Sequence, residues 1–475
     1  MTVTSDPPTG GGGTSASERS SSPTTSHLAG PAEPGSVPAH LLNAARQLRA
    51  VTVEVDESAV PDLVRAGGGT DRLLWRKSDF VLLGVGQALR LPLPGGWADP
   101  AHVRLVREVL AAVPAVDEVG RPGSGPVAAG ALAYDPSLAG HLSIPRLLVG
   151  QRDGASWATL VVPEGPQVGT TARRAIEDEL FALRDDTVTS HQPDGFELGA
   201  SMPHDEWKQL VLRTVAKIEE GHFDKVVLAR RVDVVGNRPF VVHAILARLA
   251  SLYPSCAVFH VHGFLGASPE TLVARSRHNV LSHPLAGTVA RSGDEVTDAD
   301  LVAGLMASAK DRREHQLVVD AIAARLAPLC RSLDVPAEPS VLALRNVSHL
   351  GTAIRGSLLA ADGAAHSSAA SLATSLELAA LLQPTPAVGG HPTEAALQWQ
   401  RDNEGFERGC YAGPVGWVDS RGDGEWALGL RSANVSGSHA SLYAGNGIVA
   451  GSDPDAELAE TQLKLQALLA ALVRP

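Results

Sequence analysis

The carboxyl-terminal stretch GIVAGSDPDAELAETQLKLQALLAAL, residues 447–472, constrains the fold most, because it predicts a helix with a row of charges beside an apolar face. Asp453 suits the N-cap, and the proline after it suits the first helical position. Glu457, Glu460 and Lys464 follow at spacings of three and four, which places them on one stripe. An exposed glutamate–lysine pair contributes only about 0.3–0.5 kcal/mol. Local helix stability therefore does not explain this row.

A second helix is expected in KDRREHQLVVDAIAARLAPL, residues 310–329, and it also carries a carboxylate on its apolar stripe. Glu314 lies four residues before Val318, on the inward side of the predicted helix. An isolated carboxylate on a buried face costs several kcal/mol unless it is paired or bound to a metal. Magnesium suits such ligands because it prefers oxygen donors. The alternative is that Glu314, Glu457 and Glu460 lie at solvated helix edges.

Two further stretches carry groups suited to acid–base chemistry. DKVVLARR, residues 224–231, predicts a strand with Lys225 among apolar neighbours. A lysine in an apolar sheet loses solvation, which favours the neutral amine that a general base needs; the alternative is an edge-strand lysine that reaches water. GASPETLV, residues 266–273, places Glu270 after a Ser-Pro turn, and here the alternative is an ordinary helix-start glutamate.

The net charge, the length of the apolar runs and the number of cysteines argue against several classes of protein. Forty basic against fifty-two acidic residues give a net charge of −12 without a long basic run, which disfavours nucleic acid and anionic membranes as partners. No apolar run approaches eighteen residues, so no membrane span is expected. The three cysteines, Cys256, Cys330 and Cys410, are widely separated and show no metal-ligand spacing. A reducing cytoplasm is the simplest setting.

Composition shifts divide the chain into three parts. Residues 1–36 are mostly Gly, Ser, Thr and Pro and predict a disordered tail without a signal peptide. Residues 37–200 mix short β-prone runs with helices and end at a polar break, and residues 201–475 continue the mixture without a regular βαβ rhythm. We expect an α+β fold with substantial antiparallel sheet.

The segment YAGNGIVAG, residues 443–451, contains a Gly-x-Gly, which suggests a nucleotide site at first sight. Its spacing does not fit the dinucleotide fingerprint, and the helix after it begins with Asp-Pro-Asp, which would repel a pyrophosphate. Two interpretations stay open. The segment is either a plain turn or a loop whose backbone amides meet a carboxylate.

Nine stretches, in this order, resemble the chorismate-utilising enzyme family: KVVLAR, SPETL, PLAGT, KDRREH, SHLGTAIRG, PTPAVGG, YAGPVGW, LRSANV and AGNGIVAGSDPDAELAETQLK. They lie within residues 203–468. Members of the family include isochorismate synthases, salicylate synthases, anthranilate synthase large subunits and aminodeoxychorismate synthases. The resemblance implies two α/β halves with largely antiparallel sheets packed together and flanked by helices, with the active site between them. Residues 37–200 would be the variable amino-terminal half, and 201–475 the chorismate-binding core.

The resemblance also implies a magnesium site. It assigns Glu314 and Glu460 as metal ligands, with Glu457 near the metal or holding its water, and the ring carboxylate of chorismate would bind the ion. Lys464 would lie beside that carboxylate.

The remaining substrate contacts follow from the same resemblance. Arg431, Tyr411 and backbone amides around Gly445 would hold the enolpyruvyl carboxylate. His349 would orient the leaving hydroxyl, or it is a structural histidine. Two small residues of the PLAGT and PTPAV motifs complete the set: Thr288 and Ala387.

The choice of reaction depends on single positions. Lys225 would activate a water that adds at C2, and Glu270 would protonate the departing C4 hydroxyl; relatives that use ammonia typically have Gln at the position of Lys225. Aminodeoxychorismate synthases have a nucleophilic lysine where this chain has Ala286. Salicylate synthases usually have threonine where this chain has Ala387, whereas Gln383 departs from the histidine common in relatives.

These positions imply an isochorismate synthase that converts chorismate reversibly to isochorismate with magnesium. The alternative is a salicylate synthase, which continues to pyruvate elimination. A silent metabolite-binding protein would have lost acid, base or metal residues, yet every mapped position is occupied. No glutaminase subunit is expected, since no ammonia is needed, and the resemblance favours a monomer. The sequence leaves menaquinone and siderophore biosynthesis open, and we favour menaquinone because that use is common.

Overall fold

The structure is a computed structural model that describes residues 38–69, 71–165, 168–185, 191–359 and 372–473. The disordered tail predicted for residues 1–36 lies outside this part. Residues from Val37 onward group into one unit, which is described below.

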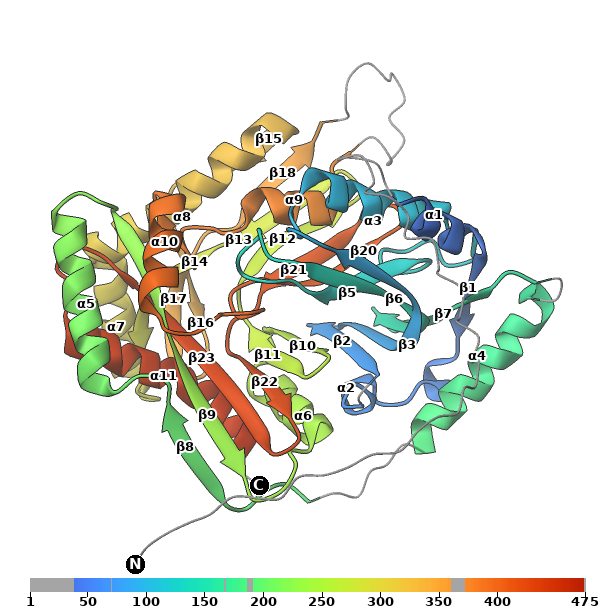
Figure 1. Ribbon diagram of the computed structural model, residues 1–475, viewed down its shortest axis with the longest axis horizontal. Coiled ribbons are helices and arrows are strands. Elements are labelled where there is room, and N and C mark those ends of the chain that lie inside the picture. Colours follow the sequence, from blue (N-terminus) through green and yellow to red (C-terminus); the bar gives the residue numbers. More distant parts are fainter. Residues whose placement is uncertain (1–37, 70, 166–167, 186–190, 360–371, 474–475) are drawn as a thin grey trace, which may run out of the picture. The chain divides into compact units, whose positions relative to one another are not determined.

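Most strands belong to one connected network of largely antiparallel pairs (Figure 1). Its strands are β1 Leu48–Val55, β2 Arg72–Lys77, β3 Phe80–Leu93, β4 Ala115–Asp117, β5 Val127–Ala131, β6 Gly140–Arg152, β7 Ala155–Pro163, β8 Phe196–Ala200, β9 Lys225–Gly236, β10 Ala257–Val261, β11 Phe264–Ser268, β12 Thr271–Ser276, β13 Asn279–His283, β15 Cys330–Asp334, β18 Ile354–Leu358, β19 Gly390–His391, β20 Pro414–Asp419, β21 Gly424–Leu428, β22 Ser432–Ser436 and β23 His439–Ile448. A separate three-stranded sheet consists of β14 Leu285–Ala290, β16 Ser340–Ala343 and β17 Val347–Gly351.

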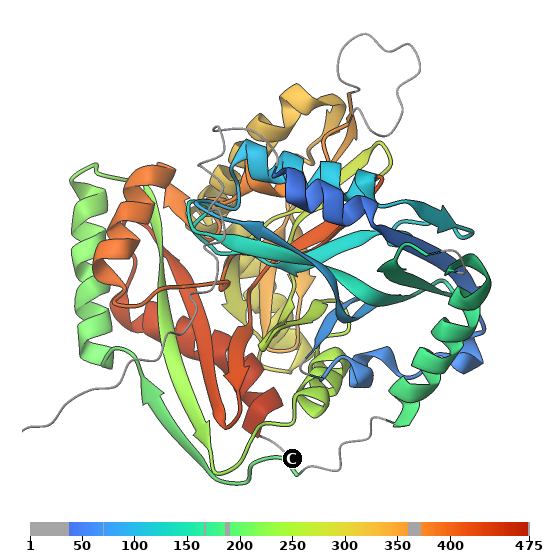
Figure 2. The ribbon, with the colours of Figure 1, turned by 45° about the vertical axis from the view of Figure 1, so that its right-hand side comes forward.

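Helices flank these sheets. They are α1 Ala39–Arg46, α2 Leu63–Ala66, α3 Pro100–Ala112, α4 Val168–Asp185, α5 His204–Glu219, α6 Val242–Leu252, α7 Glu295–Ala307, α8 Ala309–Leu326, α9 Ser375–Leu382, α10 Thr393–Asn403 and α11 Pro454–Val473. Two short 3₁₀ helices lie at Glu57–Ala59 and Ala327–Leu329. Helices α1 and α3 cover the strands β5 and β6, and the rotated view shows the same layering (Figure 2). The α+β expectation with largely antiparallel sheets is confirmed.

Strand pairing joins the amino-terminal part to the carboxyl-terminal part. β2 pairs with β10, and β5 pairs with β20 through Ala129 opposite Trp417. The largest cluster of buried apolar side chains also draws on both parts, for example Leu91 and Val106 with Ile322 and Leu376. The two parts therefore share strand pairs and a core.

The two site helices begin as their sequences predict. The Asp453 carboxylate accepts a hydrogen bond of 2.8 Å from the Ala456 amide at the start of α11. Ser308 caps α8 in the same way, with 3.2 Å between its hydroxyl and the Asp311 amide. These caps satisfy amides that have no partner within a helix. Both helices therefore start at fixed positions, and their charged side chains project at predictable turns.

The interpretation of 443–451 as a turn is wrong for most of the segment. Residues 443–448 belong to β23, which pairs with β9 over ten residues, so Gly445 and Gly447 lie in a regular strand. A Cβ at Gly447 would lie 2.4 Å from Glu314 Oε1 and 2.6 Å from Lys225 Cε. This glycine therefore allows a close approach of charged side chains to the strand.

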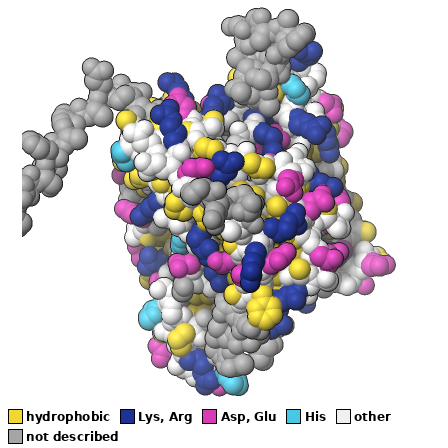
Figure 3. Space-filling model, turned by 90° about the vertical axis from the view of Figure 1, so that its right-hand side faces the viewer, with side chains coloured by type: hydrophobic (Ala, Val, Ile, Leu, Met, Phe, Trp, Pro, Cys, Tyr) yellow, Lys and Arg dark blue, Asp and Glu magenta, His cyan; other side chains and the backbone are white. Residues whose placement is uncertain are grey.

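Surface charge is mixed on the face that Figure 3 shows, where basic and acidic side chains are interspersed. Among the described residues, no helix is both long enough and apolar enough to cross a membrane.

Candidate active site

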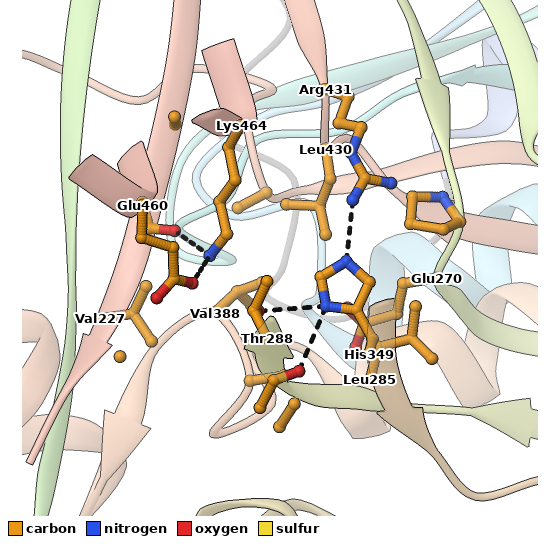
Figure 4. A pocket seen from close by; sticks show the side chains of 18 of the residues that line it. Val227, Glu270, Leu285, Thr288, His349, Val388, Leu430, Arg431, Glu460 and Lys464 are labelled. Atoms are coloured by element: carbon orange, nitrogen blue, oxygen red, sulfur yellow. Dashed lines mark hydrogen bonds and ion pairs between the residues drawn. The ribbon is translucent and has the colours of Figure 1, made fainter. Parts of the chain in front are cut away.

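One cavity gathers side chains from β9, β11–β12, β14, β17, α8, β23 and α11 (Figure 4). Of the predicted site residues, it is lined by Glu270, Thr288, Glu314, His349, Ala387, Tyr411, Arg431, Gly445, Glu457, Glu460 and Lys464. The exception is Lys225, which lies behind the cavity wall. Motifs scattered over more than two hundred residues thus meet at one place.

Of the two predicted site carboxylates of α11, Glu457 is not at a solvated helix edge, whereas the Glu460 side chain is 30% exposed. Glu457 is only 5% exposed, and burial followed by the charge of Glu460 raises its pKa. Lys464 Nζ donates to Glu460 Oε1 at 2.8 Å, and Lys310 Nζ lies 3.8 Å from Glu457 Oε1. The row of charges therefore faces the cavity, with lysines already placed against two of its carboxylates.

Lys225 and Glu314 form an ion pair at the wall of the cavity. Lys225 is 1% exposed, and its Nζ lies 2.9 Å from Glu314 Oε1. The alternative of an edge-strand lysine that reaches water is wrong, because β9 is bordered by β8, β19 and β23. Glu314, from α8, lies between the amine and the cavity.

Glu270 occupies the link between β11 and β12, so the alternative of a helix-start glutamate is also wrong. Its side chain is 4% exposed, and burial raises its pKa to about 8, although Lys225, Lys464 and Arg431 each oppose that rise. The backbone of the link is held by β21, because the Leu428 amide donates to the Glu270 carbonyl at 3.2 Å. At neutral pH this residue is a carboxylic acid with a proton to give.

His349 connects two other predicted contacts, as Figure 4 shows. Arg431 Nη2 lies 2.8 Å from His349 Nε2, and His349 Nδ1 lies 3.1 Å from the Thr288 hydroxyl. Since a guanidinium only donates, Nε2 must accept and Nδ1 carries the proton. Burial and the charge of Arg431 lower the pKa of His349 well below its usual value, in agreement with a neutral ring. His349 is therefore suited to orienting Arg431 and Thr288.

Arg431 has donors that the protein leaves unused. Its side chain is buried beside the Cys256 thiol, and within the described ranges Nε and Nη1 have no hydrogen-bond partner of good geometry. A buried guanidinium with free N–H groups is the usual partner of a carboxylate. The residue has φ = 47°, so its backbone adopts the left-handed region that non-glycine residues rarely enter.

Three predicted contact residues contribute to the shape of the cavity more than to its charge. Tyr411 stacks on Tyr443 at 5.1 Å between ring centroids, and burial raises the pKa of its phenol. The carbonyl of Gly445 accepts from Lys464 Nζ at 2.9 Å. Ala387 lies in the segment between α9 and β19, beside Val388 on the cavity wall.

Sequence reasoning missed three residues at or behind the wall. Lys310 opens the KDRREH motif, so its proximity to Glu457 was within reach. Asn446, inside AGNGIVAG, contacts both Glu457 and Lys464. Arg408 lines the cavity and donates to the carbonyls of Val227 and Val388. Sequence spacing does not predict the contacts of Asn446 and Arg408, because those contacts depend on how β9, β23 and α11 meet.

The carboxylates that line the cavity are ligands of the kind that magnesium prefers. Three carboxylates line one cavity, and burial, followed by the charge of Glu460, raises the pKa of Glu457. In the described part of the chain, no three His, Cys, Asp or Glu side chains are grouped closely enough to form a complete metal site. Magnesium usually takes one or two protein carboxylates and completes its shell with water or substrate oxygens. One or two of the cavity-lining carboxylates Glu460, Glu457 and Glu314 would supply that incomplete set.

The chain as a whole is similar to known proteins. The model of the family described as "Chorismate binding enzyme" matches residues 40–473. The chain therefore belongs to the chorismate-binding enzyme family. Within it, the chain is similar to isochorismate synthases: the isochorismate synthase DhbC of Bacillus subtilis is 39% identical over 286 residues, which are 56% of this chain and 68% of that protein.

Two further similarities cover more of the chain. The isochorismate synthase EntC of Escherichia coli is 33% identical over 349 residues, 72% of this chain and 80% of that protein. The solved structure of the menaquinone-specific isochorismate synthase MenF from Escherichia coli matches with a TM-score of 0.71 at 28% identity, over 90% of this chain and 95% of that one.

Proposed function

We propose that this protein is an isochorismate synthase, which converts chorismate to isochorismate by adding water at C2 and expelling the C4 hydroxyl. The observation that carries the proposal is the buried acid Glu270, with a pKa of about 8, in the same cavity as Arg431 and the α11 carboxylates. Relatives named isochorismate synthase support the same reading. The small-molecule substrate would be chorismate, as in the family.

The proton balance assigns roles to two residues. A base removes a proton from the attacking water, and Glu270 gives its proton to the C4 oxygen, which leaves as water. Because one water is consumed and one released, the reaction is an isomerisation and can run in both directions. Glu270 suits the acid role, since burial keeps it protonated at neutral pH.

Lys225 is the proposed base. In the structure its ammonium is paired with Glu314 at 2.9 Å and does not line the cavity. An ammonium has no lone pair to accept a proton, so Lys225 must first give a proton away, to Glu314 or to solvent, and part from Glu314 before its neutral amine acts on water. This requirement makes the Lys225–Glu314 pair part of the proposed mechanism.

Magnesium is the proposed cofactor, with Glu314, Glu457 and Glu460 to hold it. It would supply a positive charge for the ring carboxylate of the substrate. Arg431, with its unused donors, would bind the second carboxylate, on the enolpyruvyl group. Lys464, fixed beside Glu460, would add positive charge near the metal-bound carboxylate.

The test is one incubation of the purified protein with chorismate and Mg²⁺, with products separated by chromatography. Isochorismate as the accumulating product supports the proposal. Salicylate with an equal amount of pyruvate would favour a salicylate synthase instead, and unchanged chorismate would refute both. The same incubation with EDTA should abolish turnover, which excess Mg²⁺ should restore.

The setting and pathway are further proposals. A reducing cytoplasm is supported by three cysteines that are free in the structure. No glutaminase subunit is proposed, because the nucleophile is water and not ammonia, and a monomer is proposed from the resemblance to isochorismate synthases. Similar proteins are named for both menaquinone and vibriobactin pathways, and we favour menaquinone.

A further inference from the structure

Asn446 lies behind the cavity and contacts two of the side chains that line it. It belongs to β23 between Gly445 and Gly447, which both line the cavity, and is itself 1% exposed. Because side chains alternate along a strand, Asn446 points to the opposite side, toward α11. It therefore acts only through other residues.

The Asn446 amide connects a carboxylate to an ammonium. Its Nδ2 donates to the Glu457 carbonyl at 2.8 Å and to Glu457 Oε2 at 3.2 Å, while its Oδ1 accepts from Lys464 Nζ at 2.8 Å. The opposite orientation of the amide would set NH₂ against the ammonium and oxygen against oxygen, so the contacts fix its orientation. Only an amide of this length donates to one charge and accepts from the other.

Lys464 is fully engaged in this arrangement. Its three donors meet Gly445 O at 2.9 Å, Asn446 Oδ1 at 2.8 Å and Glu460 Oε1 at 2.8 Å. An ammonium has three N–H groups, so Lys464 cannot turn toward Glu457 without losing a bond. Asn446 thus keeps the ammonium on Glu460 and leaves Glu457 Oε1 free of it.

We propose that Asn446 is a positioning residue that separates the Glu457 carboxylate from the Lys464 ammonium and so keeps Glu457 available to a divalent cation. Without the amide, the two charges would pair across the vacated space and compete with the cation. The inference rests on the proposed function for its metal, but it concerns cation affinity and not the identity of the product.

The test compares Mg²⁺ affinity in the ligand-free full-length protein by isothermal titration calorimetry. Asn446→Leu keeps roughly the size of the side chain and removes both polar contacts without adding a charge, whereas Asn446→Ala removes the side chain beyond Cβ. The matched control is Asn346→Leu, because Asn346 Nδ2 also holds α11, through the Leu463 carbonyl at 2.9 Å, without touching either charge. Removing a side chain that orients a metal ligand typically costs about 10–100-fold in affinity.

We expect both Asn446 variants to bind Mg²⁺ about 10–100-fold more weakly than the wild type, and the control within about twofold of it. The Mg²⁺ concentration for half-maximal turnover should rise in parallel, with kcat recovered at saturating Mg²⁺. Unchanged affinity in the Asn446 variants, equal weakening in the control, no Mg²⁺ binding by the wild type, or loss of cooperative melting in both Asn446 variants would overturn the inference. Failure of the proposed function would appear separately, as a wild type that binds Mg²⁺ but forms no isochorismate.

Discussion

Glu270 differs from the other carboxylates of the cavity because its burial holds the proton on it. Its pKa, raised to about 8, means that the acid form exists below that pH and is lost as the pH rises through it. We therefore expect kcat/KM to fall above pH 8 in the wild type. Glu270→Gln keeps the shape but cannot give a proton, so kcat should fall about 10²–10⁴-fold with little change in KM. A pH–rate profile of both proteins checks this, and an alkaline limb that persists in the variant would contradict it.

Arg431 is expected to act on binding instead. Its free N–H groups suit a carboxylate, and a hydrogen bond to a charged group is worth about 1.5–3 kcal/mol, or roughly 10–100-fold in affinity. Arg431→Lys keeps the charge but loses the planar fork, so KM for chorismate should rise by about that factor. Arg238→Lys is the matched control, because Arg238 is exposed and paired with Asp194 at 3.3 Å. Steady-state kinetics decide the matter, and an unchanged KM would exclude Arg431 as a carboxylate ligand.

At the residue scale, sequence reasoning located the site but not the contacts between its members. Eleven of the twelve predicted residues line one cavity, because motifs mark where chemistry is needed. The pairing of Lys225 with Glu314 was not predictable, since each was considered on its own element. Asn446 escaped notice because its use depends on two partners from another element.

At the element scale, a buried ion pair fastens the end of α10 to the cavity wall. Arg408 donates to Glu404 Oε2 at 2.8 Å and to the carbonyls of Val227 and Val388, and Glu404 Oε1 accepts from the Ala229 amide at 2.8 Å. Both side chains are under 5% exposed. The pair thus connects β9 with the segment that carries Val388, and both line the cavity.

Breaking this pair should destabilise the protein strongly. Glu404→Ala leaves a buried guanidinium without its partner, so the free energy of unfolding should drop by about 3–5 kcal/mol. The control is Arg401→Ala, which removes an ion pair to Asp135 whose arginine is 49% exposed and should cost no more than about 1 kcal/mol. Urea denaturation measures both. An equal loss of unfolding free energy in the two variants would show that burial does not determine how strongly the Arg408–Glu404 pair stabilises the protein.

Elements with clear periodicity were predictable, and those set by tertiary contacts were not. The helices α8 and α11 and the strand β9 lie where the spacing of their residues placed them. The Gly-x-Gly of β23 suggested a turn, because glycine is typical of turns. In the structure Gly447 is needed for the approach of Lys225 and Glu314, which local sequence does not reveal.

For the whole molecule, the division near residue 200 marks a change in sequence character and not a physical boundary. β5 pairs with β20 across it, and Arg421 Nη1 meets Asp117 Oδ2 at 3.0 Å. The Asp419 carboxylate, buried so that its pKa rises to about 6, accepts from the Gly123 amide at 3.2 Å. Such long-range links leave no local signal, so the sequence predicted two halves packed together but not which strands and side chains join them.

This joining predicts that residues 201–475 cannot fold alone. Without residues 37–200, β10 and β20 lose their partners β2 and β5, and buried apolar side chains such as Trp417 and Phe259 lose part of their cover. Unpaired strand edges beside exposed apolar surface favour aggregation. The fragment 201–475 should therefore be insoluble or show no cooperative thermal transition by circular dichroism. Residues 37–475 should melt in one transition, because the shared sheet and core make one cooperative unit. Cooperative melting of the isolated fragment, with chorismate turnover retained, would show that the amino-terminal part is dispensable for the site.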